Sequence, residues 1–333
     1  MEKLLEGMTV VEVAYYYPGP YCCKVLSELG ARVIKIEPPS GEPMRYREDI
    51  YLGMNAGKDI ITLDLKRDGD RERLYRIVEN ADVFVEGFRP GVAEKLGMDY
   101  RTLKEINDGL IYCSITGFGQ KSEMKRPVHD INILSLSGIC EISGLSGSMP
   151  SDPNVQLSDF ASAITAAVAI LSAYLRKMRT GKGAYIDVSM YNSALFAIPL
   201  HFLNAINKND PLPEFYSNPG YRIYRAKDCY VSFGILDEPK FWKVLCERLG
   251  LDEYRDISFG ERIERSEEIE KRISEKLSEL GRGDLERIFM EDIPYGFVND
   301  LSSVSSQSSM AREKVFMDKV VKTISFPATF HLG

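Results

Sequence analysis

The 333-residue sequence has little of what marks a secreted, zinc-binding or nucleic-acid-binding protein. Its six cysteines include no C-x-x-C pair and its histidines number only three, so we expect reduced, mostly buried thiols and no metal site. Acidic residues (49) outnumber basic ones (42), and the formal net charge of −7 argues against a general nucleic-acid or anionic-membrane surface. An anionic ligand would therefore need a local basic pocket.

Long apolar segments are also scarce. The longest uncharged run, residues 160–175, is rich in Ala, Ser and Thr and is shorter than the roughly 20 apolar residues of a membrane span, so a buried core helix is the better prediction. The first residues carry acids among apolar residues and lack the basic-then-apolar pattern of a signal peptide. We expect a cytoplasmic protein with no membrane span and no nucleic-acid partner.

Apolar runs that alternate with helical stretches fill the first part of the chain. Strands are predicted at residues 9–14, 32–37, 59–65, 82–88, 110–119 and 184–190, and helices at 20–29, 71–80, 92–96, 100–106 and 158–179. This alternation predicts an α/β fold with a Rossmann-like, mainly parallel sheet.

The remainder predicts a smaller α+β domain. Residues 204–218 are rich in Pro, Asn and Asp and read as part of a linker, 221–234 as a hairpin that turns at Lys227 and Asp228, and 251–290 as amphipathic helices. The serine-rich residues 300–309 predict a flexible loop. The resulting division is a large domain (1–200), a linker (201–220), a small domain (221–300) and a second linker (301–314).

A dinucleotide site is one hypothesis for the first strand–helix–strand unit, because Glu37 ends its second strand where an acidic residue would hold a ribose. The glycine-rich loop of such sites is absent. The sequence has YYYPGPY at residues 15–21, with one glycine and two prolines, so a pyrophosphate could not approach the backbone in the usual way. A nicotinamide role is disfavoured.

The ends of several predicted strands carry cations, at Lys58, Lys66, Arg67 and Arg89. Arg89 lies directly after a buried strand and before a helix, which places a guanidinium where α/β sheets bind ligands. A surface arginine that pairs with Glu94 is an equally good interpretation of its position alone.

Three acid–base residues are candidates for catalysis. His129 stands beside Asp130 and is either a structural histidine or a base that transfers protons near neutral pH. Asp159 opens the Ala-rich helix and is either a helix cap or a reacting carboxylate that the helix start keeps ionised. Glu238 precedes Pro239 at another helix start, where simple charge complementarity is the alternative to function.

Several blocks together resemble the class III CoA-transferase family, also called CaiB/BaiF, which includes the α-methylacyl-CoA racemases. In chain order they are LEGMTVVEVAYYYPGPYCCKVLSELGARVIKIEPPSGEPMRY, NAGKDIITLDLK, DVFVEGFRPGVAEKLGMDY, LIYCSITGFGQ, VHDIN, SDF at residues 158–160, and RTGKGAYIDVSMYNSA. The resemblance covers almost the whole chain and is more specific than any single motif.

The resemblance implies that the chemistry is centred on Asp159. In the transferases this aspartate is a nucleophile that accepts acyl and CoA groups, whereas in the racemases it is paired with a histidine, here His129, and a glutamate, here Glu238, orients that histidine. The segments HDIN and GILDEPKFW look like the racemase versions. We therefore predict 1,1-proton transfer at the α-carbon of a 2-methylacyl-CoA-type thioester through an enolate.

Two other functions are considered. One is a class III CoA-transferase that moves CoA between carboxylic acids through an Asp159 anhydride. The other is a non-catalytic subunit that binds an acyl-CoA.

In the racemase mechanism, backbone N–H groups at the helix start beside Asp159 are suitable donors to the enolate oxygen.

For coenzyme A, which is part of the substrate, the resemblance implies contacts near Ile61, Thr62, Leu63, Asp64, Arg89, Val128 and Asp130. It implies no metal and no bound cofactor. Racemases often have an arginine where this chain has Pro38, and Arg45 or Lys58 is the expected substitute at the 3′-phosphate. The resemblance also implies a large CoA-binding domain completed by the C-terminal tail (about 315–333) and an interlocked homodimer.

Overall fold

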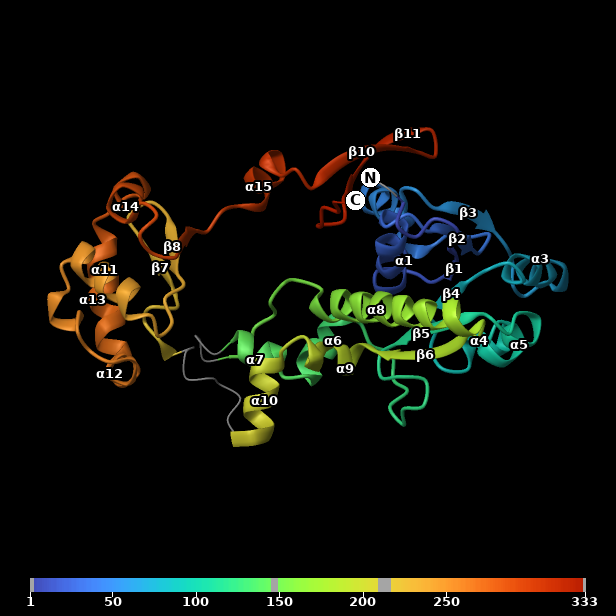
Figure 1. Cartoon of the computed structure of the whole chain (residues 1–333), viewed down its shortest axis with the longest axis horizontal. Helices are drawn as coiled ribbons and strands as arrows, with labels where there is room; N and C mark the ends of the chain where they lie inside the picture. The colour runs from blue at the N-terminus through green and yellow to red at the C-terminus, as the bar shows by residue number, and fades with distance from the viewer. Residues whose placement is uncertain (1–2, 145–148, 209–216, 332–333) are drawn as a thin grey trace. The chain divides into compact units, whose positions relative to one another are not determined.

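The computed structural model describes residues 3–144, 149–208 and 217–331, and the chain divides into two compact units. The larger unit comprises residues 1–199 together with 309–333, and the smaller unit comprises residues 200–308. Figure 1 shows the helices and strands of both units along the chain.

A six-stranded sheet forms the centre of the larger unit, in the order β3-β2-β1-β4-β5-β6, with every neighbouring pair parallel. Its strands are β1 (Thr9–Val13), β2 (Arg32–Glu37), β3 (Asp59–Thr62), β4 (Val83–Glu86), β5 (Ile111–Thr116) and β6 (Ala184–Ser189). The predicted α/β fold with a parallel sheet is confirmed. Several strands are shorter than predicted because pairing stops where the chain turns away into the loops of the sheet's carboxyl edge.

Helices cover both faces of this sheet, since side chains alternate along each strand. One face packs against α1 (Pro18–Glu28) and α8 (Leu157–Thr180), through side chains that include Leu26 and Ile170. The other packs against α3 (Asp68–Val78) and α5 (Tyr100–Ile106), through Leu74 and Leu103. The remaining short helices of the unit are α2 (Glu48–Asn55), α4 (Val92–Lys95), α6 (Asp130–Leu136), α7 (Ile139–Ser143) and α9 (Met190–Phe196), with a 3-10 turn at Pro43–Tyr46.

Helix α8 corresponds to the long uncharged run of the sequence. One side packs against α1, β5 and β6, while the other exposes Val168, Leu175 and Met178 by 59%, 65% and 69%. The prediction of a buried core helix therefore holds for one side only. Among the described residues α8 is the one helix long and apolar enough to cross a membrane by those two criteria, and core helices of globular proteins meet them as well.

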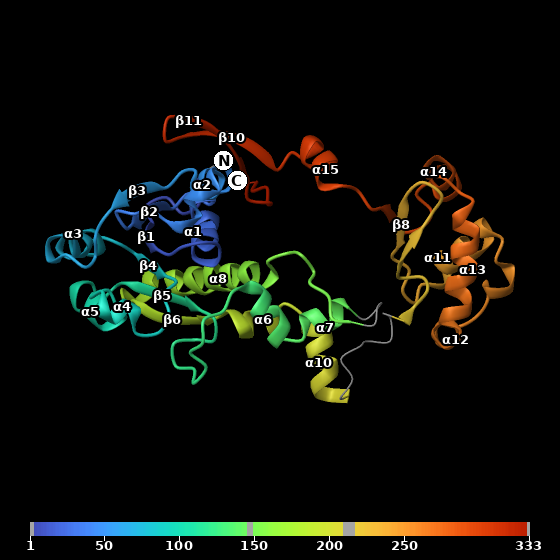
Figure 2. The same ribbon diagram turned by 180° about the vertical axis from the view of Figure 1, so that it is seen from behind.

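The C-terminal hairpin, β10 (Ala311–Phe316) and β11 (Lys319–Ile324), lies beside α2 (Figure 2). Phe316 and Val321 pack on Tyr51 of α2, and the Thr323 hydroxyl donates to the Gly53 carbonyl at 2.7 Å. Glu28 of α1 pairs with Lys24, Arg312 and Lys314. The tail thus joins the larger unit from residue 309.

The smaller unit contains a three-stranded antiparallel sheet, β7 (Ile223–Arg225), β8 (Tyr230–Phe233) and β9 (Tyr295–Phe297). The predicted hairpin is confirmed as β7 and β8. Helices α11 (Pro239–Leu249), α13 (Ser266–Ser278) and α14 (Arg282–Phe289) share its core around Trp242, beside the short α12 (Phe259–Glu264). The unit has the expected α+β character.

Two segments predicted to be irregular contain helices. Helix α10 (Pro199–Lys208) occupies the start of the predicted 201–220 linker, and 209–216 lie outside the described residues. Helix α15 (Leu301–Gln307) occupies the serine-rich segment, where the Asp300 carboxylate accepts the Ser303 N–H at 2.9 Å and caps the helix. Composition was misleading here because the Asp300 cap stabilises a short helix whose interior serines do not favour it.

A buried ion network joins the carboxyl half of β1 to its neighbours. The two carboxylate oxygens of Glu12 lie 2.6 Å from Lys35 Nζ and 2.7 Å from Lys58 Nζ. Lys35 Nζ is also 2.8 Å from Glu42 and donates to the Ala14 carbonyl at 2.8 Å. Burial by itself raises the pKa of Glu12, but the two lysines hold it below its ordinary value.

Because Lys58 is only 4% exposed and is bound to Glu12, the Pro20 carbonyl and Asn55, it cannot also hold a phosphate. The prediction that Lys58 substitutes for the arginine missing at Pro38 is therefore wrong.

Removal of Lys35 should destabilise the protein strongly. Lys35→Met leaves the buried Glu42 without its counter-charge and Glu12 with Lys58 alone, so we expect the free energy of unfolding to fall by about 3–5 kcal/mol. The matched control is Arg32→Met on the same strand, where the pair with Asp59 is 67% and 54% exposed and contributes about 0–1 kcal/mol. Urea denaturation followed by circular dichroism measures both, and equal losses would contradict the assignment.

Candidate active site

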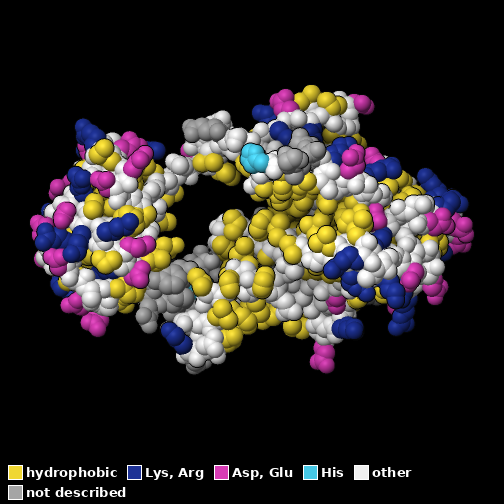
Figure 3. Space-filling model, viewed as in Figure 1, with side chains coloured by type: hydrophobic (Ala, Val, Ile, Leu, Met, Phe, Trp, Pro, Cys, Tyr) yellow, Lys and Arg dark blue, Asp and Glu magenta, His cyan; other side chains and the backbone are white. Residues whose placement is uncertain are grey.

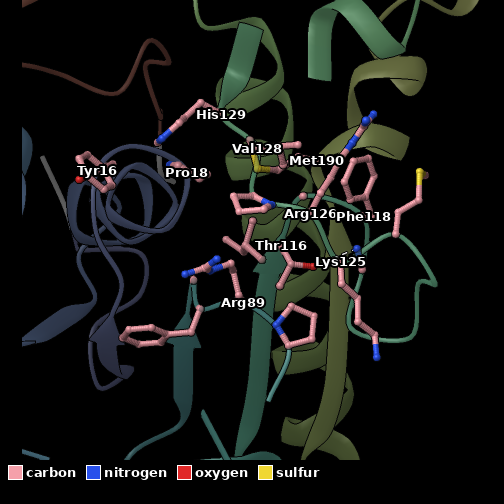
Figure 4. Close-up of a pocket in the computed structure, with 18 of the residues that line it drawn as sticks. Tyr16, Pro18, Arg89, Thr116, Phe118, Lys125, Arg126, Val128, His129 and Met190 are labelled. Atoms are coloured by element: carbon pink, nitrogen blue, oxygen red, sulfur yellow. Dashed lines mark hydrogen bonds between the residues drawn. The ribbon is translucent and has the colours of Figure 1, made fainter. Parts of the chain in front are cut away.

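A cavity of about 540 Å³ opens in the larger unit beyond the carboxyl ends of three strands (Figure 4). Its walls come from residues 15–18 after β1, 87–90 after β4, and 115–119 and 124–129 at and after the end of β5. Asp159 of α8 and Met190 of α9 complete the lining. Open α/β sheets bind their ligands at this edge, because the loops there converge around the strand ends.

Asp130 caps the start of α8. Its Oδ1 accepts the N–H groups of Ser158 at 2.8 Å and Asp159 at 3.0 Å, and also the Ser158 hydroxyl at 2.5 Å. Asp159 is the third residue of the helix, after the N-cap residue Gln156. The helix-cap interpretation of Asp159 is therefore wrong, and Asp159 instead lines the cavity.

The charge state of Asp159 also differs from the prediction. Burial, and second the negative charge of Asp130, raise the pKa of Asp159 to about 7. The expectation that the helix start keeps this carboxylate ionised is wrong, because the first N–H groups of α8 are already bound to Asp130. Near neutral pH, Asp159 is divided between its acid and its base forms.

His129 is the N-cap residue of α6, and its backbone N–H donates to Asn132 Oδ1 at 3.0 Å. The imidazole lies edge to face against the Tyr16 ring, with centroids 6.0 Å apart and an interplanar angle of 89°. Figure 4 shows His129 directed toward the side of the cavity where Tyr16 lies. The fold thus brings His129 and Asp159, from two different helices, to one cavity.

Three cations line the same cavity (Figure 4). They are Arg89 and the consecutive residues Lys125 and Arg126. Within the described ranges no ion pair joins Arg89 to Glu94, so the alternative of a surface pair is not observed. These residues make a local basic pocket in an acidic chain, as the composition required. Lys125 and Arg126 were missed, although a lysine–arginine pair four residues before His129 was a usable signal.

Of the residues predicted to contact CoA, Val128 also lines this cavity, whereas Asp130 is occupied with the cap of α8. A second cavity of about 120 Å³ is lined by Leu63, Asp64 and Lys66. The two cavities share Tyr15 and Phe88.

Of the other residues expected at coenzyme A, Ile61 and Thr62 belong to β3 and are absent from the described lining of either cavity. Glu37 lies at the edge of the smaller cavity and is occupied by protein groups, accepting from the Tyr51 hydroxyl at 2.6 Å and Arg45 at 2.7 Å. Arg45 is therefore held by Glu37.

Glu238 belongs to the smaller unit. It is the N-cap residue of α11, and its Oε2 accepts the N–H of Leu236 at 2.8 Å. This contact fits the interpretation of a residue at a helix terminus. Its predicted role in orienting His129 stays a prediction.

The raised pKa of Asp159 predicts a pH-dependent stability. The folded protein binds a proton at Asp159 between about pH 4 and 7 where the unfolded chain does not, so the free energy of unfolding falls as pH rises through this window. Asp159→Asn should therefore stabilise the protein by roughly 1–3 kcal/mol more at pH 8 than at pH 4. Thermal or urea unfolding at the two pH values measures the difference.

The control is Asp49→Asn, since Asp49 is an exposed aspartate in the first turn of α2. A similar pH dependence in both variants would show that the effect does not come from burial of Asp159.

The profile of CoA-transferase family III matches residues 5–331. Succinyl-CoA:mesaconate CoA-transferase of Haloarcula hispanica is 32% identical over 296 residues (81% of this chain, 74% of that protein). Human alpha-methylacyl-CoA racemase is 35% identical over 257 residues (74% and 65%). A CAIB/BAIF family protein from Brucella suis superposes with a TM-score of 0.87 at 27% identity (99% and 93%). The resemblance inferred from the motifs is confirmed, and the chain belongs to CoA-transferase family III.

Proposed function

We propose that the protein is an acyl-CoA racemase or epimerase, which moves the α-hydrogen of a 2-methylacyl-CoA-type thioester between the two faces of the α-carbon. The observation that carries the proposal is the presence of His129 and Asp159 in one cavity, on different helices. Racemisation needs two proton carriers, one to remove the α-proton and one to return a proton to the other face of the enolate.

The charge state of Asp159 suits this exchange. A carrier that must act as a base in one direction and an acid in the other works best when its pKa lies near the working pH, and the pKa of Asp159 is about 7. Histidine side chains in general exchange protons in the same range. In one direction His129 removes the α-proton while protonated Asp159 donates, and the roles reverse in the other.

The enolate oxygen needs hydrogen-bond donors, which the sequence suggested at the start of α8. That expectation is wrong for the first two N–H groups after Leu157, because Ser158 and Asp159 both donate to Asp130. The hydrogen-bond donors to the enolate oxygen must therefore come from another part of the cavity wall.

Coenzyme A is proposed to lie along the same edge of the sheet. Arg89, Lys125 and Arg126 supply positive charge for its phosphates, and Val128 lines the same wall. Leu63 and Asp64 line the smaller cavity that continues from Tyr15 and Phe88. The thioester itself acidifies the α-hydrogen, so the proposed reaction requires no metal and no bound cofactor.

A CoA-transferase is the second candidate, because relatives such as the Haloarcula hispanica protein are named as CoA-transferases. Asp159 would then attack the thioester carbonyl, release the CoA thiolate and form a mixed anhydride. The thiolate would attack the aspartyl carbonyl and release the first carboxylate, the acceptor carboxylate would displace CoA from the resulting aspartyl thioester, and the thiolate would then attack the acceptor's carbonyl to give the new acyl-CoA and free Asp159. The attacking carboxylate must be ionised. His129 has no necessary part in that chemistry, which is why the pair of residues favours the racemase.

An interlocked homodimer is proposed as the assembly. Figure 3 shows apolar side chains gathered over α8, and the side of α8 away from the sheet exposes Val168, Leu175 and Met178. Exposed apolar patches of this kind are typical of protein–protein interfaces. A second copy of the chain is the occupant that the resemblance implies.

The racemase proposal predicts a stereochemical pattern of hydrogen exchange. In deuterated buffer, both enantiomers of a 2-methylacyl-CoA should exchange the α-hydrogen and racemise. His129→Gln and Asp159→Asn should each slow racemisation by roughly 10²-fold or more, because one carrier is lost. Each variant keeps the other carrier, so each should still exchange one enantiomer, and the two variants should retain opposite enantiomers. Mass spectrometry and chiral chromatography measure both effects.

The control is His331→Gln, an exposed histidine of the C-terminal tail. The racemase proposal is wrong if no branched acyl-CoA exchanges its α-hydrogen while CoA passes between two carboxylic acids. In that case hydroxylamine added during turnover should convert Asp159 to a hydroxamate, which identifies the transferase.

The dimer proposal predicts a sedimenting mass of twice 37.6 kDa. Val168→Lys places a charge in the exposed apolar stripe of α8 and should shift the monomer–dimer equilibrium toward the monomer. The control Tyr46→Lys, at an exposed tyrosine, should leave that equilibrium unchanged. Sedimentation equilibrium of the three proteins tests this, and a monomeric wild type would contradict the proposal.

A further inference from the structure

Tyr16, in the loop between β1 and α1, has a φ angle of +63°. This left-handed conformation is one that residues other than glycine rarely adopt, and for a bulky side chain it is strained. Such residues persist where surrounding contacts hold them in place, and they cluster at functional sites. Tyr16 lines the cavity that contains His129 and Asp159, so its conformation bears on the site itself.

The buried ion network holds the backbone of this loop on both sides of Tyr15. The Tyr16 N–H donates to Glu42 Oε1 at 2.7 Å, and the other oxygen of Glu42 lies 2.8 Å from Lys35 Nζ. The same ammonium binds the Ala14 carbonyl at 2.8 Å. Glu42 is 3% exposed and Lys35 is fully buried, so water does not compete for these contacts.

The loop in turn sets the position of the Tyr16 ring. Tyr16 is 44% exposed, so protein packing constrains its side chain only in part, and the held backbone fixes the direction in which that side chain leaves the loop. Its edge-to-face partner is the imidazole of His129, at a centroid distance of 6.0 Å. Both rings are drawn in Figure 4 on the same side of the cavity. A continuous set of contacts therefore leads from Lys35 through Glu42 and Tyr16 to His129.

We propose that Tyr16 is a positioning residue for His129, and that the buried pair of Lys35 and Glu42 acts on the reaction through the backbone of Tyr16. The inference rests on the proposed proton transfer by His129. The aromatic edge limits the rotation of the imidazole, so that its nitrogen stays aligned with the α-carbon, and a displacement of about 1 Å at such a group can cost 10²-fold in rate.

The two single-carrier variants allow the role of Tyr16 to be measured on one carrier at a time. In the Asp159→Asn background, where His129 carries the remaining exchange, Tyr16→Ala should lower kcat by roughly tenfold or more with KM changed less than about threefold. In the His129→Gln background, where Asp159 carries it, Tyr16→Ala should change kcat less than about twofold. Damage to the whole cavity would lower both exchanges equally and would overturn the proposal.

Two conservative changes separate positioning from folding. Tyr16→Phe keeps the ring and should recover most of the kcat that Tyr16→Ala loses. Tyr16→Gly removes both the ring and the strain, so it should raise the melting temperature while it lowers kcat as Tyr16→Ala does. A gain in stability with full activity would overturn the proposal. Tyr46→Ala, at a tyrosine 78% exposed and outside the cavity, is the matched control.

The route through Glu42 is tested by non-additivity. Glu42→Gln should lower kcat in the otherwise wild-type protein, and it should lower kcat no further when combined with Tyr16→Ala. Additive losses would show that Glu42 acts on the reaction independently of Tyr16, which would overturn this part of the proposal.

One readout does not depend on the reaction. The imidazole ¹H–¹³C resonance of His129, assigned by its loss in His129→Gln, should shift in Tyr16→Ala and stay unchanged in Tyr46→Ala. An unchanged resonance overturns the positioning role. If instead His129→Gln retains full exchange of both enantiomers while Tyr16→Ala still moves the resonance, the proposed function fails and the structural contact stands.

Discussion

The architecture of the site depends on the buried ion pairs of the Lys35 ammonium group. This ammonium lies fully buried at the carboxyl half of β2, between Glu12 and Glu42, and it also binds the carbonyl where β1 ends. A charge in such a place is tolerated only when its surroundings satisfy it completely. The loop after β1, which forms one wall of the cavity, is therefore tied to the most strongly constrained part of the sheet. That wall can keep Tyr16 in a conformation that an unsupported loop would leave.

A second constraint operates at the start of α8, where two carboxylates share one helix terminus. Asp130 takes the first N–H groups and the stabilisation that a helix start offers an anion. Asp159, the third residue of α8, is instead buried and repelled by the negative charge of Asp130, and its pKa rises to about 7. One helix terminus thus brings together a carboxylate that caps the helix and a carboxyl group whose raised pKa suits proton exchange.

The sequence predicted the sheet, most of its helices and the hairpin of the smaller unit, because buried apolar runs and turn residues carry those elements locally. The family resemblance implied that His129 and Asp159 lie together, and the position of Arg89 directly after a strand placed it at the ligand-binding edge; all three line one cavity. The sequence could not predict that Asp130 caps α8 or that Lys58 is buried. Those facts depend on contacts between residues far apart in the chain, and a helix-start motif looks the same whichever carboxylate caps it.

The racemase and the transferase make opposite demands on Asp159. A nucleophile gains from a carboxylate that is always ionised, and a site built for that purpose would direct the free N–H groups of α8 at Asp159. Here Asp130 occupies those groups, and burial together with the negative charge of Asp130 raises the pKa of Asp159 to about 7, so a fraction of Asp159 is protonated near neutral pH. Such a protonated fraction is idle in anhydride formation, yet it is the form that must return a proton to an enolate. The raised pKa of Asp159 therefore supports the proposed proton exchange, in which His129 of the same cavity would be the second carrier.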